Sequence, residues 1–350
     1  MKSLKAGLYI ALGTAFALSA STAMASDAPI SGNLRIVIGS NSTGGDTYQN
    51  AAIIAAHLGE KLDMNVRVDA VGAVAGFRAL KQQGKTGATI MFNHDQSYLG
   101  NLYGVKGYDD IFAEYKIGPT ISINPGNAYL VPKDSPYKTV DDIIEAAGKG
   151  ERVRVSVERG SASNIGFSAL ENAVKMKYPG AEKNLALINT GSQSDKNQAL
   201  FDGQADVIHG SIQGNEQFTR LPADDQKAMR FIWITAKGET IEQMPEEGLG
   251  ETTRDMMLQW TDPVTSVPQS ADGDLFNFDK MFYFMYNKDI DPKIVAYFDE
   301  AMTEIFEEGK IQSDFKRSFF IPSFRASPEA EKFLVNKKDD YAEILSAIQK

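Results

Sequence analysis

The sequence predicts an α/β fold of two lobes, each with a largely parallel sheet and helices on its faces. Residues 36–38 (Ile-Val-Ile) are continuously apolar, as in a strand buried on both faces of a sheet, and residues 47–62 follow with apolar side chains at helical spacing. The strand–helix rhythm starts again after the turn residues 124–126. Polar loops rich in glycine and serine follow two of the predicted strands. Together these observations predict two doubly wound lobes.

The first lobe is predicted from alternating short apolar runs and amphipathic segments near the start of the chain. In the first helix Ala51, Ile54 and Leu58 share one side, which is the spacing of a face packed on a sheet. The predicted strands are 35–39, 66–70 and 88–92, and the predicted helices are 47–62 and 75–83. A strand–helix–strand order of this kind is typical of a doubly wound sheet.

The second lobe repeats this order. Its predicted strands are 129–131, 153–157, 185–188 and 205–208, and its predicted helices are 139–147, 164–177 and 195–201. Residues 243–279 are rich in Pro, Gly, Glu and Asp and predict a long irregular connection. An apolar strand at 281–286 and helices at 292–309 and 328–348 then return to the first lobe. The expected boundaries are 26–125 plus 240–350 for the first lobe and 126–239 for the second.

The first 25 residues are predicted to be a secretory signal peptide. Lys2 and Lys5 form its basic start, residues 6–20 its apolar stretch, and residues 23–25 (Ala-Met-Ala) an A-x-A cleavage site. Cleavage is expected after Ala25, which places the mature protein in the periplasm. The apolar stretch is too short to span a bilayer.

Composition excludes several classes of function. The chain has no cysteine, which excludes disulfides, a cysteine nucleophile, thiolate metal sites and a lipidated amino terminus. Its formal net charge is −10, and removal of the signal makes it about −12. A chain this acidic is not expected to bind nucleic acid or anionic lipid, because both require a basic surface. Any bound anion must be held by local dipoles.

Two loops are the main candidates for a ligand site, because each lies between the end of a strand and the start of a helix. A helix N-terminus carries unpaired N–H groups and a partial positive charge, and two such loops facing each other would form a cleft for a carboxylate. The candidate ligand-binding residues are Ser40, Asn41, Ser42, Thr43, Gly44, Gly45, Asp46 and Thr47 in the first loop, and Arg159, Ser161, Ser163 and Asn164 in the second.

Both loops also have a purely structural interpretation. Thr43 and Asp46 have the spacing of a capping box, and Ser161 or Ser163 could simply cap a helix. Asp46 would repel an anion, so a role in holding the turn is favoured for it. Arg159 could contact a second acidic group of the ligand, or pair with Glu158 or another surface carboxylate.

Further polar residues lie at other predicted strand ends. They are His94, Thr190, Ser192 and Ser211. A single histidine in such a place is more often a satisfied hydrogen-bonding residue than a catalyst, and the three histidines of the chain lack metal-ligand spacing. Residues 210–214 lack the spacing of a nucleophile elbow, and no phosphate-binding or dinucleotide-binding glycine motif is present. The sequence therefore predicts no cofactor, no metal and no catalytic residue.

The order and spacing of several segments resemble the periplasmic receptors of tripartite tricarboxylate transporters, the TctC or Bug receptors. The segments are residues 44–48 and 57–59, VPKDSPYKTVDDII at 131–144, residues 160–164, residues 190–192, ALFDGQADV at 199–207, residues 291–305 and residues 327–334. Asn41 and Ser42 stand where this family usually has a proline and a third glycine. Glu158 and Arg159 replace residues that are commonly small in this family. This indicates that one end of the ligand differs from that of the family's usual ligands.

The resemblance implies a type II-like venus-flytrap fold of the periplasmic binding protein kind, with a carboxylate held by loop amides and hydroxyls of both lobes. It also implies the membrane subunits of such a transporter as partners. The predicted function is capture of a small di-, tri- or aromatic carboxylate by a monomeric receptor, with a sensor kinase as a further partner left open. The alternatives are a secreted hydrolase that acts on carboxylates or esters, with Ser161, Ser163 or Ser211 as nucleophile and His94 or His209 as base, and a TRAP-type receptor.

Overall fold

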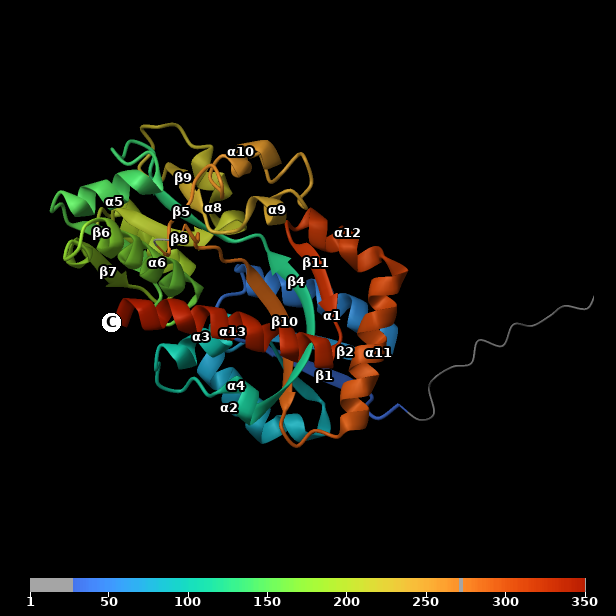
Figure 1. Cartoon of the computed structure of the whole chain (residues 1–350). Helices are drawn as coiled ribbons and strands as arrows, with labels where there is room; N and C mark the ends of the chain where they lie inside the picture. Colours follow the sequence, from blue (N-terminus) through green and yellow to red (C-terminus); the bar gives the residue numbers. More distant parts are fainter. Residues whose placement is uncertain (1–27, 271–272, 350) are drawn as a thin grey trace, which may run out of the picture.

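The computed structural model describes residues 28–270 and 273–349 and contains two mixed sheets (Figure 1). The predicted signal peptide lies outside these residues. The first sheet has the order β11-β4-β10-β3-β1-β2, and the second has the order β7-β6-β8-β5-β9. The predicted fold class of two α/β lobes is confirmed.

The first sheet combines strands from both ends of the chain. Its strands are β1 (Asn33–Ile38), β2 (Asn65–Ala70), β3 (Thr89–His94), β4 (Tyr115–Asn124), β10 (Lys280–Asn287) and β11 (Ile321–Arg325). β1 pairs in parallel with β2 and β3, whereas β10 and β11 run antiparallel to their neighbours. The helices that follow or cover these strands are α1 (Asp46–Leu62), α2 (Ala73–Gln83), the 3-10 helix Gly84–Thr86, α3 (Gln96–Leu102), α4 (Ile111–Glu114), α11 (Pro292–Glu308) and α12 (Lys310–Arg317).

The second sheet is drawn from the middle of the chain. Its strands are β5 (Asn127–Pro132), β6 (Val153–Val157), β7 (Leu185–Asn189), β8 (Val207–Ser211) and β9 (Met229–Ile234). β6 is parallel to β7 and β8, and β5 is antiparallel to β8 and β9. Its helices are α5 (Val140–Gly148), α6 (Ala162–Lys177), the 3-10 helix Glu182–Asn184, α7 (Gln193–Phe201) and α8 (Ile212–Thr219).

The connection from the second lobe back to the first is irregular, as predicted, but it is packed. It holds the short helices α9 (Gly238–Ile241) and α10 (Arg254–Leu258). Ile241, Met244 and Met257 share a hydrophobic cluster with Ala128 and Phe231 of the second sheet. The division at residue 239 remains a prediction, because these contacts place part of the later connection against the second lobe.

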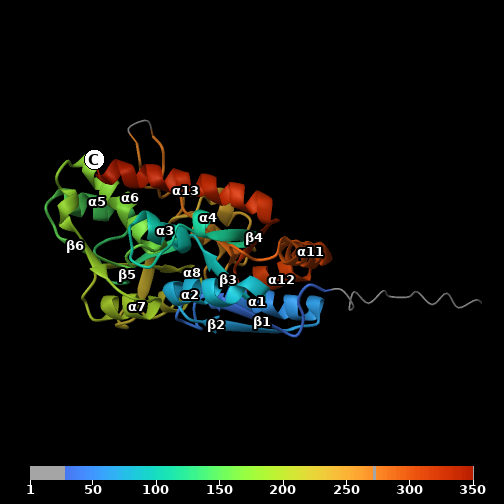
Figure 2. The ribbon, with the colours of Figure 1, turned by 90° about the horizontal axis from the view of Figure 1, so that it is seen from below.

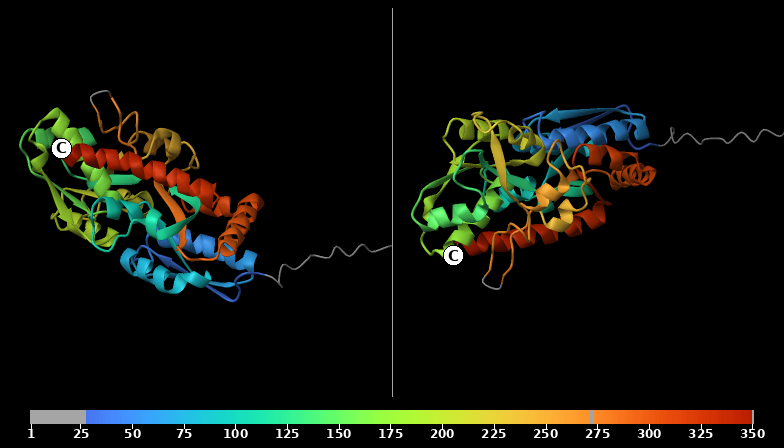
Figure 3. Two further views of the ribbon diagram at one scale, coloured as in Figure 1. Left: turned by 60° about the horizontal axis from the view of Figure 1, so that its bottom comes forward. Right: turned by 90° about the horizontal axis from the view of Figure 1, so that it is seen from above.

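The last helix, α13 (Ser327–Gln349), runs along both lobes (Figures 1 and 2). It packs against β4 of the first sheet and against α6 of the second lobe. The largest hydrophobic cluster is accordingly continuous between the lobes and includes Tyr98, Phe167 and Leu334. The two lobes therefore meet through packed side chains along this helix, and Figure 3 shows the same arrangement from two further directions.

Candidate ligand-binding site

A polar cavity of about 1080 Å³ is lined by residues from both lobes. From the first lobe come residues 39–47 after β1, residues 71–75 at the start of α2, and His94 at the end of β3. From the second lobe come residues at the ends of β6 and β8 and at the start of α7. These are carboxyl ends of parallel strands, which is where open α/β sheets bind ligands.

The structure brings most of the predicted site residues together around this cavity. Those that line it are Ser40, Asn41, Ser42, Thr43, Gly44, Gly45, Asp46, Thr47, His94, Ser161, Ser163, Ser192 and Ser211. Three others do not line it. Arg159 is exposed, Asn164 accepts a hydrogen bond from the Gly160 N–H at 2.9 Å, and the Thr190 hydroxyl lies 3.2 Å from that of Ser156. Whether the lining residues bind a ligand stays a prediction.

Several helices of both lobes begin at the cavity wall, among them α2 of the first lobe, whose N-cap Gly72 lines the cavity. Four more are α1 from the first lobe and α6, α7 and α8 from the second, with Gly45, Ser161, Ser192 and Ser211 as their N-caps. Each serine accepts a hydrogen bond from a backbone N–H of its own helix. The positive ends of these helix dipoles therefore converge on one cavity, which favours an anionic group there.

The first loop does not contain the capping box that its sequence allowed. The N-cap of α1 is Gly45 and not Thr43, so Asp46 is the first residue of the helix. The loop is instead held by its own serines, because the Ser42 N–H donates to the Ser40 hydroxyl at 3.0 Å and the Gly44 N–H donates to the Ser42 hydroxyl at 3.2 Å.

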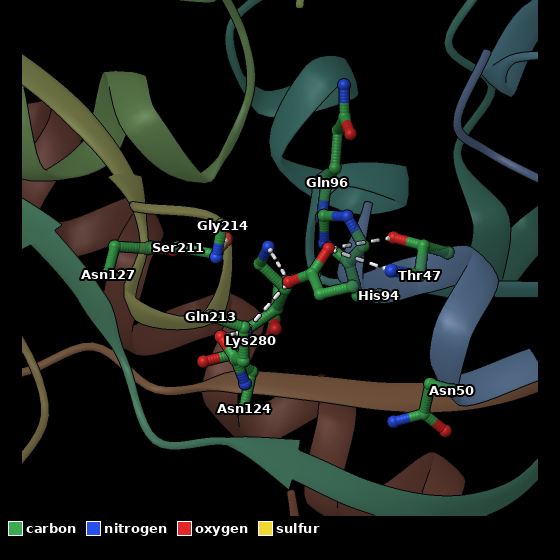
Figure 4. Close-up of polar contacts among 12 residues, drawn as sticks. Thr47, Asn50, His94, Gln96, Asn124, Asn127, Ser211, Gln213, Gly214 and Lys280 are labelled. Atoms are coloured by element: carbon green, nitrogen blue, oxygen red, sulfur yellow. Dashed lines mark hydrogen bonds and ion pairs between the residues drawn. The ribbon is translucent and has the colours of Figure 1, made fainter. Parts of the chain in front are cut away.

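Asp46 is tied to the rest of the first lobe by Lys280 and Asn124, both of which are labelled in Figure 4. Its carboxylate lies 2.6 Å from the Lys280 ammonium and 2.8 Å from the Asn124 side-chain amide. Burial by itself would raise the pKa of Asp46, but the Lys280 charge and hydrogen bonds from Lys280 and Asn124 bring it to about 2. Asp46 is therefore ionised and paired, and it fixes the start of α1 to β4 and β10.

His94 and His209 line the cavity from opposite lobes and are both buried. Burial, followed by the charge of a nearby lysine, holds the pKa of each well below its usual range. His94 Nδ1 accepts from the Gln96 N–H at 3.2 Å, so its proton resides on Nε2. His209 has no hydrogen-bond partner for either ring nitrogen among the described residues. Both are neutral polar groups in the wall.

The serines proposed as nucleophiles are not arranged as a catalytic pair. The Ser161 hydroxyl donates to the Glu158 carbonyl at 2.7 Å, and the Ser163 hydroxyl accepts from the Glu158 N–H at 2.8 Å. Within residues 28–270 and 273–349, neither these hydroxyls nor that of Ser211 is hydrogen-bonded to a histidine. The same residues contain no cluster of three His, Asp or Glu side chains suited to a metal ion.

Several lining residues could not be found as site residues from the sequence. Lys280 lies 234 residues from Asp46 and opens a strand, so nothing local marks it. Lys196 could have been noticed in the sequence, because the helix dipole disfavours a lysine near the N-terminus of α7. Asn127 of β5 and Gln96 of α3 also reach the cavity, and so does Glu158 after β6, which the family resemblance had related to the ligand.

Structures of periplasmic binding proteins have the same fold. BugD shares 16% sequence identity, with a TM-score of 0.65, and the match covers 91% of this chain and 98% of BugD. MatC of Rhodopseudomonas palustris with bound malate shares 13% identity with a TM-score of 0.64, covering 89% of this chain and 98% of that chain. An adipate-bound R. palustris protein shares 14% identity with a TM-score of 0.71, covering 91% and 97%.

No protein-family model and no curated protein sequence matches the chain. The structural likeness therefore shows the fold, which is that of the two-lobed periplasmic binding proteins. The resemblance to Bug and TctC receptors is confirmed at this level, since structures of both kinds align over about nine-tenths of the chain, at 91% and 90%.

Proposed function

We propose that this protein is a periplasmic solute receptor that captures a small organic carboxylate between its two lobes. The observation that carries the proposal is the convergence of helix N-termini from both lobes, those of α1, α2, α6, α7 and α8, on one polar cavity. Preorganised N–H groups and dipoles bind an anion through charge-assisted hydrogen bonds without a matching basic surface. The acidic net charge of the chain is compatible with this mode of binding.

Capture would stabilise a closed arrangement of the lobes. Hydrogen bonds already connect them: the Gln96 amide donates to the Glu158 carboxylate at 3.1 Å, and the Asn124 amide donates to the Gln213 side chain at 3.1 Å. A ligand that contacts both lobes favours the closed state, because only that state offers both sets of contacts.

The proposed partners are the membrane subunits of a tripartite tricarboxylate-type transporter, to which the loaded monomer would present its ligand unchanged. A sensor kinase is a second candidate partner. None of the helices in the described part of the chain has the length and apolar character needed to cross a bilayer. Export is tested by mass spectrometry of the protein secreted to the periplasm, whose first residue should be Ser26.

The binding proposal is tested by calorimetry and thermal shift with malate, adipate, citrate and benzoate. At least one should bind and be recovered unchanged. Thr43→Trp places a bulky ring in the cavity from an exposed position and should abolish binding without unfolding the protein. Thr86→Trp, exposed and outside the cavity wall, is the matched control and should bind normally. No heat and no thermal shift across a broad carboxylate panel would contradict the proposal, and conversion of a ligand would favour the hydrolase.

A further inference from the structure

The cavity wall contains two opposite charges that the protein itself does not pair. Asp46 and Lys280 neutralise each other at 2.6 Å. Lys196 and Glu158 remain, both from the second lobe, and Arg78 lies at the exposed rim of the cavity. These five are the charged side chains among the described residues that line the cavity. The class of ligand therefore depends on which charged groups can pair with Lys196 and Glu158.

Lys196 is buried without a partner. Its side chain lies on α7 and lines the cavity, the residue is only 6% exposed, and its ammonium forms no hydrogen bond or ion pair with any described residue. Burial lowers the pKa of Lys196 to about 8, against the opposing effect of Glu158. The ammonium is not among the fully enclosed polar atoms that lack a partner, so it faces the cavity, where an anion from outside the chain can pair with it.

Glu158 is the acidic counterpart at the end of β6. One of its carboxylate oxygens accepts from the Gln96 side-chain amide at 3.1 Å, and the same amide nitrogen donates to the Tyr108 hydroxyl at 3.0 Å. Gln96 is thus fixed and holds Glu158 in place. Burial raises the pKa of Glu158, and the charge of Lys196 opposes this without direct contact. The carboxylate therefore has a neutral hydrogen-bond donor but no cation in contact with it.

Further polar atoms of the second lobe are unpaired in the same wall. Both side-chain amide atoms of Asn127 and both ring nitrogens of His209 are buried and lack a hydrogen-bond partner among the described residues. Buried polar atoms are normally satisfied, so this concentration favours a polar ligand at this part of the wall. It lies on the second lobe, opposite the Asp46–Lys280 pair of the first.

We infer that the ligand is a zwitterion, a small carboxylate that also carries a protonated amine, with its carboxylate on Lys196 and its ammonium on Glu158. This inference rests on the proposed function and specifies its ligand class. A ligand with a carboxylate only would leave Glu158 without a cation, and a dianion would bring a second negative charge towards it. A zwitterion pairs the buried Lys196 and the half-buried Glu158 at once.

The test compares matched ligands that differ only in the amine. Calorimetry at pH 7 would measure aspartate against succinate, glutamate against glutarate, alanine against propionate, and phenylalanine against 3-phenylpropionate. The amine-bearing member of the pair that fits should bind at least tenfold more tightly. Glu158→Gln keeps an acceptor for Gln96 but removes the charge, and should abolish this preference. Lys196→Met should weaken every carboxylate at least tenfold while leaving the unliganded protein equally or more stable to heat.

Asp195→Asn is the control, because Asp195 is exposed on the same helix and does not line the cavity. It should leave the ratio within each pair unchanged. Equal or tighter binding of the amine-free acids by the wild type, or an unchanged preference in Glu158→Gln, would overturn the zwitterion and leave the receptor function standing. Failure of every acid in both series to bind would contradict the receptor function itself. The wild-type comparison decides the question even if a variant does not fold.

Discussion

Asp46 and Lys280 lie in the cavity wall, but their charges form an ion pair with each other. The side chains are about one-tenth exposed, at 11% and 10%, and their charged atoms are 2.6 Å apart. Removal of one partner from a buried pair leaves an uncompensated charge, which costs far more than the pair itself contributes. This ion pair therefore affects the stability of the β1–α1 loop more than it affects ligand binding.

Lys280→Met is expected to lower the free energy of unfolding by about 3–5 kcal/mol, because it leaves the Asp46 carboxylate buried and unpaired. Urea denaturation measures the change. The control is Lys85→Met, since Lys85 and Asp289 are 2.7 Å apart but both about two-thirds exposed, at 64% and 63%. That variant should unfold at the wild-type urea concentration. Equal effects of the two substitutions would show that the Asp46–Lys280 pair is not desolvated.

The same carboxylate predicts a pH dependence. The pKa of Asp46 in the folded protein is about 2, below its ordinary value of 3.8, so its ionised form stabilises the fold above about pH 4. This contribution, about 2 kcal/mol, is lost as the pH falls from about 4 to 2. Asp46→Asn should therefore show a shallower loss of stability over that range in acid-dependent urea titrations. A loss as steep as that of the wild type would assign the acid sensitivity to other groups.

Several elements with a regular apolar pattern were predicted from the sequence, although the apolar strand β9 was not. The strand at residues 153–157 has the predicted bounds, and α1 begins one residue before its predicted start. β4 was missed, because Gly118 and Pro119 in its middle argue against a strand. The sheet accommodates them where its register with β10 shifts, and a Cβ at position 118 would lie 2.8 Å from that of Phe284.

The candidate site was likewise predicted only in part from the sequence. Loops that follow strands were recognisable because small polar residues and glycine mark helix starts locally. Lys280 and Asn127 were not recognised as site residues, because they reach the cavity only through the pairing of distant strands, and His209 was named only as a base of the hydrolase alternative. Arg159 was the cation that the sequence offered, but it is exposed, and Lys196 is the one that is buried at the cavity.

The loop before α6 supplies a prediction about contact between the lobes. Gly160 has φ +75°, and a Cβ there would lie 2.3 Å from a Val105 methyl carbon of the first lobe. Gly150 has φ +90° with open space around it. Both glycine-to-alanine variants should lose about 1 kcal/mol of stability to backbone strain. Only Gly160→Ala should also weaken ligand binding, about tenfold, because it holds the lobes apart. Equal affinities of the two variants, measured by calorimetry, would refute this role.

At the scale of the whole molecule, the lobes are joined on one side by α13 and face each other across the cavity. Lys337 of α13 lies 3.0 Å from Asp95 and 3.0 Å from Asp279, so the helix is anchored directly behind His94. The Tyr103 hydroxyl of the first lobe also lies 3.0 Å from that of Ser168 on α6. We expect the Tyr103–Ser168 hydrogen bond to break when the lobes open, so that it contributes to affinity without touching the ligand.

Tyr103→Phe is expected to reduce ligand affinity about fivefold, since the closed state loses one hydrogen bond of about 1 kcal/mol. Tyr297→Phe changes a half-buried tyrosine of α11 that packs within the first lobe and should have no effect on affinity. Calorimetric dissociation constants decide between the two outcomes. Unchanged affinity in Tyr103→Phe would mean that this contact does not distinguish the closed state from the open one.

The most direct test of the central claim is a crystal structure of the protein with its tightest-binding acid. We expect a carboxylate within hydrogen-bond distance of groups from both lobes, including the Lys196 ammonium and residues 40–47. An acid that binds outside this cavity, or that touches only one lobe, would contradict the claim that the two halves form one clamp.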